Sequence, residues 1–285
     1  MMNTNKRLLV VLAHPDDETF GMGGTLAVCA SQGVEVYLIC ATRGEVGTVD
    51  PKFMEGFDSI GQLREQELRC AGETLGLKEI FFLDYRDSGM NGSADNKHPN
   101  ALAAQPLEEV AAKVVKIMRA IKPHSVVTFD PDGGYRHPDH IAMHKAAVRA
   151  FEGAASAEEF QDGLAPHQAE RLFYMVFPRK ALRIGVRFMR FAGQDPTKFG
   201  RNQDIDLEEL TSNQDFPLHV RINVKPVMET LKIANQCHAS QLQFTEQTSG
   251  IMAAFRKLLF TSSTEHFTQV YPRIPDNQRI NSLFG

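Results

Sequence analysis

The sequence predicts an α/β fold built on a doubly wound, mainly parallel sheet. Short apolar runs alternate with longer amphipathic segments over residues 1–177, in the order βαβαβαβαβ. The first run, Leu8 to Ala13, is continuously apolar, as expected for a strand covered on both faces. Such alternation favours parallel strands joined by right-handed crossovers.

The elements follow one another from the N-terminus. The first strand ends at His14, and a helix opening at Gly23 and Gly24 ends at Gly33. Four further strands are expected at 34–41, 79–84, 125–129 and 171–177. Helical spacing of apolar residues predicts helices over 59–76, 107–121 and through 142–148. Polar loops at 42–50, 84–100 and 130–140 follow the carboxyl ends of strands.

We expect residues 1–177 to form a Rossmann-like catalytic core, and residues 178–285 to form an α+β extension that completes the same domain. The stretch 178–201 is basic and contains phenylalanines, which indicates a solvated lobe or an oligomer contact rather than an anion site. An acidic stretch, 204–209, follows it. The extension is predicted to hold a half-buried strand at 218–224 and helices at 226–241 and 251–260.

Composition narrows the class of partner. The chain has 285 residues and a net charge of −4, so nothing in its balance indicates nucleic acid or an anionic membrane. The first apolar run is too short for a signal peptide or a membrane span. The cysteines form no CxxC pair, and we expect all four to be small core residues in a reducing, cytoplasmic compartment: Cys29, Cys40, Cys70 and Cys237.

Two polar motifs are expected to meet. In the strand order 3-2-1-4-5, the first and fourth strands are neighbours and the topological switch lies between them. The motif HPDDE, 14–18, follows the first strand, and HPDH, 137–140, follows the fourth. Both should therefore border one crevice, where ligands bind in such folds.

These residue types point to metal chemistry. A catalytic zinc commonly takes two histidines and one carboxylate and leaves a position open for water. His14, one of Asp16 and Asp17, and one of His137 and His140 can supply that set. The other carboxylate can act as general base, and the other histidine can face the substrate. Spacing alone does not assign the members of each pair.

With AHPDDE at 13–18 and HPDH at 137–140, the chain resembles the LmbE-like (PIG-L) family of zinc-dependent N-acetylglucosamine deacetylases. The resemblance implies that the zinc ligands are His14, Asp17 and His140. It implies Asp16 as general base and His137 as acid and oxyanion stabiliser. Asp139 would orient a histidine. It also implies a homo-oligomer, and iron(II) can occupy such a ligand set in place of zinc.

Further segments are similar to the branch of that family that acts on thiol-cofactor precursors: TRGEVGT at 42–48, LREQEL at 63–68, DYRDSGM at 84–90 and HASQ at 238–241. By that resemblance Arg64 and Asp87 would hold sugar hydroxyls, Tyr135 would lie near the carbonyl oxygen, and His238 is a candidate substrate contact. Each has a plainer alternative. Arg64 could form an ion pair within its helix, and Asp87 could form an Asx turn. Tyr135 could be an aromatic side chain that covers the loop, and His238 could be an ordinary histidine on a helix face.

The expected function is removal of the N-acetyl group from an N-acetylglucosaminyl compound, a small-molecule substrate. Zinc-activated water would attack, Asp16 would take its proton and His137 would steady the intermediate. One alternative is an amidase of the same family that cuts a thiol S-conjugate. Another is a non-catalytic sugar- or nucleotide-binding protein, although no GxGxxG follows the first strand. A third alternative is phosphoester hydrolysis, but that reaction normally requires more metal-bridging carboxylates than we can place in this sequence.

Overall fold

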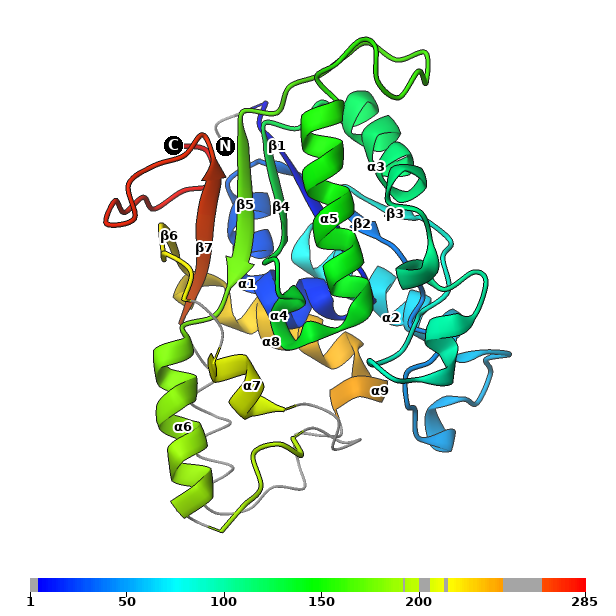
Figure 1. Ribbon diagram of the computed structural model, residues 1–285, viewed down its shortest axis with the longest axis vertical. Helices are drawn as coiled ribbons and strands as arrows, with labels where there is room; N and C mark the ends of the chain where they lie inside the picture. Colours follow the sequence, from blue (N-terminus) through cyan, green and yellow to red (C-terminus); the bar gives the residue numbers. More distant parts are fainter. Residues whose placement is uncertain (1–4, 192, 200–205, 213–214, 243–262) are drawn as a thin grey trace.

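The structure is a computed structural model that describes residues 5–191, 193–199, 206–212, 215–242 and 263–285. Its described strands form one sheet in the order β3-β2-β1-β4-β5-β7-β6 (Figure 1). The predicted order 3-2-1-4-5 is confirmed, and these five strands are parallel. They are β1 (Arg7–Leu12), β2 (Glu35–Cys40), β3 (Glu79–Phe82), β4 (Ser125–Phe129) and β5 (Arg171–Val176).

The central strand explains the apolar run near the N-terminus. β1 lies between β2 and β4, with Leu8 paired to Val36 on one side and to Ser125 on the other. Its residues from Leu8 to Leu12 have no solvent exposure. Strands buried on both faces are uniformly apolar, so the carboxyl end of β1 is where polar side chains can gather.

Helices cover both faces of the sheet. α3 and α5 pack together on the face toward the viewer in Figure 1, whereas α1, α2 and α8 pack together on the opposite face. The bounds of these helices are α1 (Asp17–Ser31), α2 (Ile60–Leu75), α3 (Leu107–Ile121), α5 (Pro138–Gly153) and α8 (Met228–Cys237). A short helix, α4 (Gly133–Arg136), lies in the loop that precedes α5.

The expected start of the first helix is wrong. α1 begins at Asp17 rather than at the glycine pair, so Asp17 and Glu18 occupy its first turn, where carboxylates interact favourably with the helix dipole. Gly23 and Gly24 follow a kink at Met22. A Cβ on Gly24 would lie 2.6 Å from the Val224 side chain, so this glycine serves close packing against the C-terminal extension.

The extension continues the sheet. β6 (Val220–Asn223) corresponds to the strand expected at 218–224, and β7 (Thr264–Tyr271), which sequence reasoning missed, joins it to β5 by antiparallel pairing. The helix expected at 226–241 is divided into η4 (Lys225–Val227), α8 and α9 (Ala239–Leu242). The helix expected at 251–260 lies outside the described residues.

Part of the basic stretch forms α6 (Arg179–Phe191), and α7 (Leu207–Ser212) packs against it. Ion pairs join α6 to acidic side chains, as between Arg190 and Glu208 and between Arg183 and Asp215. No helix in the described part of the chain is long and apolar enough to cross a membrane.

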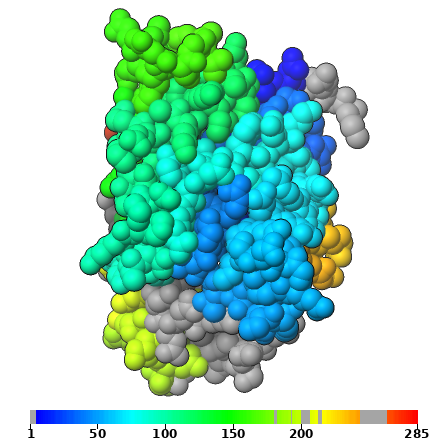
Figure 2. Space-filling view, turned by 90° about the vertical axis from the view of Figure 1, so that its right-hand side faces the viewer, coloured from blue at the N-terminus to red at the C-terminus, as the bar shows by residue number. Residues whose placement is uncertain are grey.

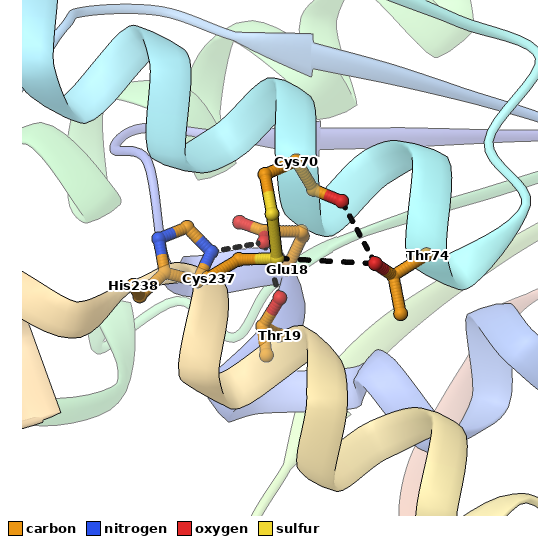
Figure 3. The surroundings of a disulfide bond; sticks show 6 residues. All are labelled: Glu18, Thr19, Cys70, Thr74, Cys237 and His238. Atoms are coloured by element: carbon orange, nitrogen blue, oxygen red, sulfur yellow. Dashed lines mark hydrogen bonds and ion pairs between the residues drawn. A yellow bond between two sulfur atoms is a disulfide. The ribbon is translucent and has the colours of Figure 1, made fainter.

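The expectation for the cysteines is half wrong. Cys29 and Cys40 are free and buried, as expected. Cys70 and Cys237, however, form a disulfide that joins α2 to the end of α8 (Figure 3). The pairing has no local signal because the two residues are 167 positions apart and meet only when the helices pack.

Candidate metal centre and active site

The two polar motifs meet at the carboxyl ends of β1 and β4, as expected from the strand order. His14 follows β1 and His140 lies in the first turn of α5, after β4. The His14 Nδ1 and His140 Nε2 atoms are 3.2 Å apart. Both side chains are almost fully buried, with 6% and 1% exposed. The loops that follow β2 and β3 lie side by side on the surface nearby (Figure 2).

Hydrogen bonds set which ring nitrogen of each histidine carries a lone pair. His140 Nδ1 lies 3.1 Å from the carbonyl oxygen of Gly133, which can only accept, so Nδ1 carries the proton. His14 Nε2 lies 3.1 Å from a carboxylate oxygen of Asp139 and donates to it in the same way. The remaining nitrogens therefore face each other. Metal-binding histidines are oriented by just such partners.

Asp17 completes this convergence. One of its carboxylate oxygens is 3.2 Å from His140 Nε2 and the other is 3.5 Å from His14 Nδ1. The backbone N–H of His14 donates to the second oxygen over 2.7 Å. Burial alone would raise the pKa of Asp17, but the neighbouring His140 and His14 hold it well below the usual range. Two imidazole nitrogens and a carboxylate directed at one point fit a divalent cation.

Other ligating groups lie close by. Among the described residues, the ligand atoms of His14, His137 and His140 lie within 4.8 Å of one another, as do those of His14, Asp87, His137 and Asp139. Burial opposes the charged form of His14, yet Asp87, Asp139 and Asp17 raise its pKa well above the usual value. The carboxylates thus favour a positive charge at His14, which a cation bound at Nδ1 would supply in place of a proton.

His137 caps the start of α5. Its Nδ1 accepts the backbone N–H of Asp139 at 3.2 Å, which places the proton of the neutral ring on Nε2. Burial and the charges of His14 and His140 hold the pKa of His137 well below its usual value. His137 is therefore suited to donating a hydrogen bond from a neutral ring.

The Asp16 carboxylate is held by Arg64 rather than by the two histidines. Its side chain is 18% exposed, and one carboxylate oxygen accepts from Nη2 of Arg64 at 2.9 Å. Burial raises the pKa of Asp16 to about 6, against the opposing effect of Arg64. Its backbone is left-handed, with φ of 114°, which is uncommon for a residue with a side chain. The two adjacent carboxylates thus point to different partners, as a ligand and a separate base require.

The remaining expected residues have the following surroundings. Arg64 is buried and donates to the carbonyls of Pro15 and Gly44 as well as to Asp16. Asp87 makes an Asx-type turn by accepting the backbone N–H of Gly89 at 2.8 Å, and the same carboxylate oxygen lies 3.5 Å from His14 Nε2.

Tyr135 and His238 contact different residues. The Tyr135 ring centroid is 4.9 Å from that of His140 and 6.0 Å from that of His137, and burial raises the pKa of its hydroxyl. His238 is fully buried, and its Nε2 is 2.8 Å from a carboxylate oxygen of Glu18.

Three further residues support the cluster, of which Ser88 and Phe129 were not predicted from the sequence and Glu45 was expected as a loop or supporting carboxylate. Ser88 donates to Asp139 from both its backbone N–H and its hydroxyl. Phe129 stacks on His140, with ring centroids 4.0 Å apart and an interplanar angle of 10°. Glu45 accepts the backbone N–H of Asp87 at 3.1 Å. Ser88 and Glu45 lie in segments already singled out by resemblance, whereas Phe129 gave no signal beyond that of a strand residue.

Comparison with known proteins adds independent findings. Residues 9–151 match the family model described as GlcNAc-PI de-N-acetylase (PIG-L). A protein of Rhodococcus erythropolis, named 1D-myo-inositol 2-acetamido-2-deoxy-alpha-D-glucopyranoside deacetylase, is 36% identical over 100% of this chain and 99% of its own length. A protein of the same name from Salinispora arenicola is 36% identical over 88% of this chain and 81% of its own.

Solved structures share the fold at lower identity. The N,N'-diacetylchitobiose deacetylase from Pyrococcus horikoshii matches with a TM-score of 0.64 and 21% identity, over 93% of this chain and 84% of that one. The 4-carboxy-2-hydroxymuconate hydratase from Pseudomonas putida matches with a TM-score of 0.59 and 21% identity, over 95% and 99%. At these identities the likeness concerns the fold alone.

Proposed function

The chain belongs to the PIG-L family of de-N-acetylases and is an amide hydrolase, and we propose that it removes the acetyl group from an N-acetylglucosaminide whose aglycone is a polyol such as inositol. Support for the aglycone comes from the names of the relatives, which match over nearly their whole length. Support for the chemistry comes from the cluster described above.

We propose zinc as the metal, held by His14, Asp17 and His140. These residues present two imidazole lone pairs and a carboxylate to one point, and Asp139 and Gly133 orient the two rings. A metal held there supplies Lewis acidity to water and to the amide carbonyl.

Asp16 is proposed as the general base. Its carboxylate lies beside the ligand cluster without belonging to it, because Arg64 holds one oxygen while the side chain keeps some exposure. It can accept a proton from the attacking water at a carboxylate oxygen and then pass that proton to the nitrogen of the departing amine. This separation of Asp16 from Asp17 is the observation that carries the proposal, since a binding protein has no need of a spare carboxylate.

His137 is proposed to stabilise the developing oxyanion. With Nδ1 engaged by the backbone, its Nε2–H is the donor that remains for the substrate carbonyl oxygen. Tyr135, packed against the same ring set, is a second candidate donor to that oxygen.

The test is acetate release from a panel of N-acetylglucosaminides with inositol, malate and simple alkyl aglycones. The zinc-loaded wild type should release acetate fastest from the inositol compound. Asp16→Ala should retain zinc and lose at least about 100-fold in kcat, in the range typical of removing an acid–base catalyst. Asp58→Ala, which removes an exposed carboxylate from the surface, is the matched control and should behave as wild type.

Zinc content separates the proposed ligands from the other histidine. His14→Ala and His140→Ala should lose the metal, whereas His137→Ala should retain it and turn over slowly. If His137→Ala empties the site, His137 is a ligand and the assignment of the set is wrong. If the wild type binds zinc, releases no acetate and instead cleaves thiol S-conjugate amides, the deacetylase proposal gives way to the amidase.

A further inference from the structure

Glu18, the last residue of the HPDDE motif, has no solvent exposure, and the hydrogen bonds of its carboxylate go to residues other than the proposed ligands of the metal. Instead, its Oε2 accepts the backbone N–H of Asp16 at 3.0 Å. Its Oε1 accepts from His238 Nε2 at 2.8 Å and from the hydroxyl of Thr19. One carboxylate therefore links the proposed base to a histidine in the C-terminal extension, 220 residues further along the chain.

The backbone of Asp16 requires such support. A left-handed conformation at a residue with a side chain is strained and persists only where surrounding contacts impose it. Two contacts hold Asp16 from different directions. Arg64 of α2 holds the carboxylate, and Glu18 holds the backbone N–H. Without the second contact, the chain at Asp16 can relax and turn the carboxylate away from its position.

The C-terminal segment is itself fixed on both sides of His238. The disulfide ties the preceding residue, Cys237, to Cys70 of α2. Two residues after His238, the backbone N–H and hydroxyl of Ser240 both donate to Glu67 of α2, each at 2.8 Å. Figure 3 shows the His238 ring directed at Glu18 next to the disulfide.

Packing alone does not explain a histidine at this position. The His238 ring is fully buried, and its Nδ1 has no hydrogen-bond partner in the described part of the chain. A buried polar atom without a partner lowers stability, and an apolar side chain of similar size would avoid that loss. The contribution of His238 therefore lies in the proton that Nε2 donates to Glu18.

We propose that Glu18 and His238 are positioning residues, which hold the backbone of Asp16 so that its carboxylate is in place as general base. This inference rests on the proposed function, in which Asp16 is that base. It gives the C-terminal extension a part in catalysis, through contact with the base and not with the substrate.

The experiment compares His238→Leu, which fills the space without a donor, with His238→Gln, whose side-chain amide can replace the Nε2–H. The readouts are kcat, KM, zinc content and thermal midpoint. His238→Leu should lower kcat by about 10- to 100-fold, as displacement of a catalytic group does, with KM and zinc at wild-type values. His238→Gln should restore most of kcat. His219→Leu, which also removes a buried histidine, controls for general destabilisation and should leave kcat unchanged.

A double variant makes the test specific to Asp16. If His238 acts through the base, His238→Leu should have no further effect on the residual rate of Asp16→Ala, because coupled residues are not additive. Equal losses of kcat in the two backgrounds would overturn the inference, as would loss of zinc, failure of His238→Gln to restore kcat, or an unchanged kcat in His238→Leu.

Glu18→Gln provides a second route should His238→Leu fail to fold. A glutamine offers one acceptor where both the Asp16 N–H and His238 need one, so kcat should fall with zinc retained, and an unchanged kcat would refute the inference. Failure of the proposed function looks different. In that case the wild type itself releases no acetate, or Asp16→Ala remains active, whatever the behaviour of the His238 variants.

Discussion

Reduction of the Cys70–Cys237 disulfide should lower the free energy of unfolding substantially. The bond closes a loop of 167 positions, and α2 and α8 retain other contacts when it is opened. Its effect therefore falls mainly on the unfolded chain, whose conformational freedom it restricts. The chain-entropy relation gives about 5 kcal/mol for a loop of this length. That is a large share of the roughly 5–15 kcal/mol that stabilises typical proteins.

The assay is urea unfolding of the zinc-loaded protein, with and without a thiol reductant. We expect reduction to lower the midpoint by about 1–2 M, given slopes of roughly 3 kcal/mol per M for a chain of this size. The matched control is the double variant Cys70→Ala, Cys237→Ala, on which the reductant should have no effect because Cys29 and Cys40 are free and buried.

Thiol counting under denaturing, non-reducing conditions decides whether the premise holds. Two of the four cysteines should react before reduction and all four afterwards. Four reactive thiols before reduction would refute the disulfide. Two thiols with a midpoint that reduction does not move would refute the entropic reasoning instead, since the bond would then exist without restricting the unfolded chain.

Three further predictions concern the residues around the cluster. Arg64→Met should lower kcat by about 100-fold with little change in KM, because the Arg64 guanidinium donates to Asp16 and to two carbonyls. A rise in KM alone would instead support Arg64 as a contact to the sugar. Gly44→Ala should also lower kcat, and it should lower the free energy of unfolding in urea by at least about 1–2 kcal/mol, since φ is +65° and a Cβ would lie 1.9 Å from Arg64 Nη1. A wild-type kcat would contradict this prediction. Asp139→Asn should weaken zinc binding by about 10- to 100-fold in competition with a chelator, because an amide cannot accept from His14 and Ser88 as the carboxylate does. Undiminished zinc affinity would count against Asp139 as the group that orients His14.

Local signals were sufficient for most of the core. The strand at Ser125–Phe129 has the predicted bounds because burial on both faces makes every residue apolar or small. α2 has the expected bounds at both ends. Ser59 caps its start by accepting the Gln62 N–H at 3.2 Å, and Gly76 stops it by adopting φ of +79° directly after its last residue. Each of these features depends on a few neighbours in sequence, which a pattern can record.

Long-range features could not be predicted in the same way. β7 is a strand because the edge of β5 offers it antiparallel partners, and its own sequence, TEHFTQVY, alternates only weakly. The disulfide and the Glu18–His238 contact join segments 167 and 220 positions apart. The same distinction between predictable and unpredictable contacts applies to the site. Topology predicted that His14 and His140 meet, whereas the contacts of Ser88 and Phe129 depend on how the loop after β3 and the end of β4 pack around them.

The fold by itself does not select deacetylation, since proteins named as a deacetylase and as a hydratase both share it at 21% identity. What the fold supplies is a place where two strand ends bring metal-ligating side chains together. The chemistry must then depend on residues that the topology leaves variable. In this chain a turn that the topology does not dictate lies at Asp16, whose left-handed backbone directs one carboxylate toward Arg64 while its neighbour Asp17 faces the histidines. If the proposed roles hold, the contacts that fix this turn, from α2 on one side and from the C-terminal extension through Glu18 on the other, are what convert a metal site into a hydrolase.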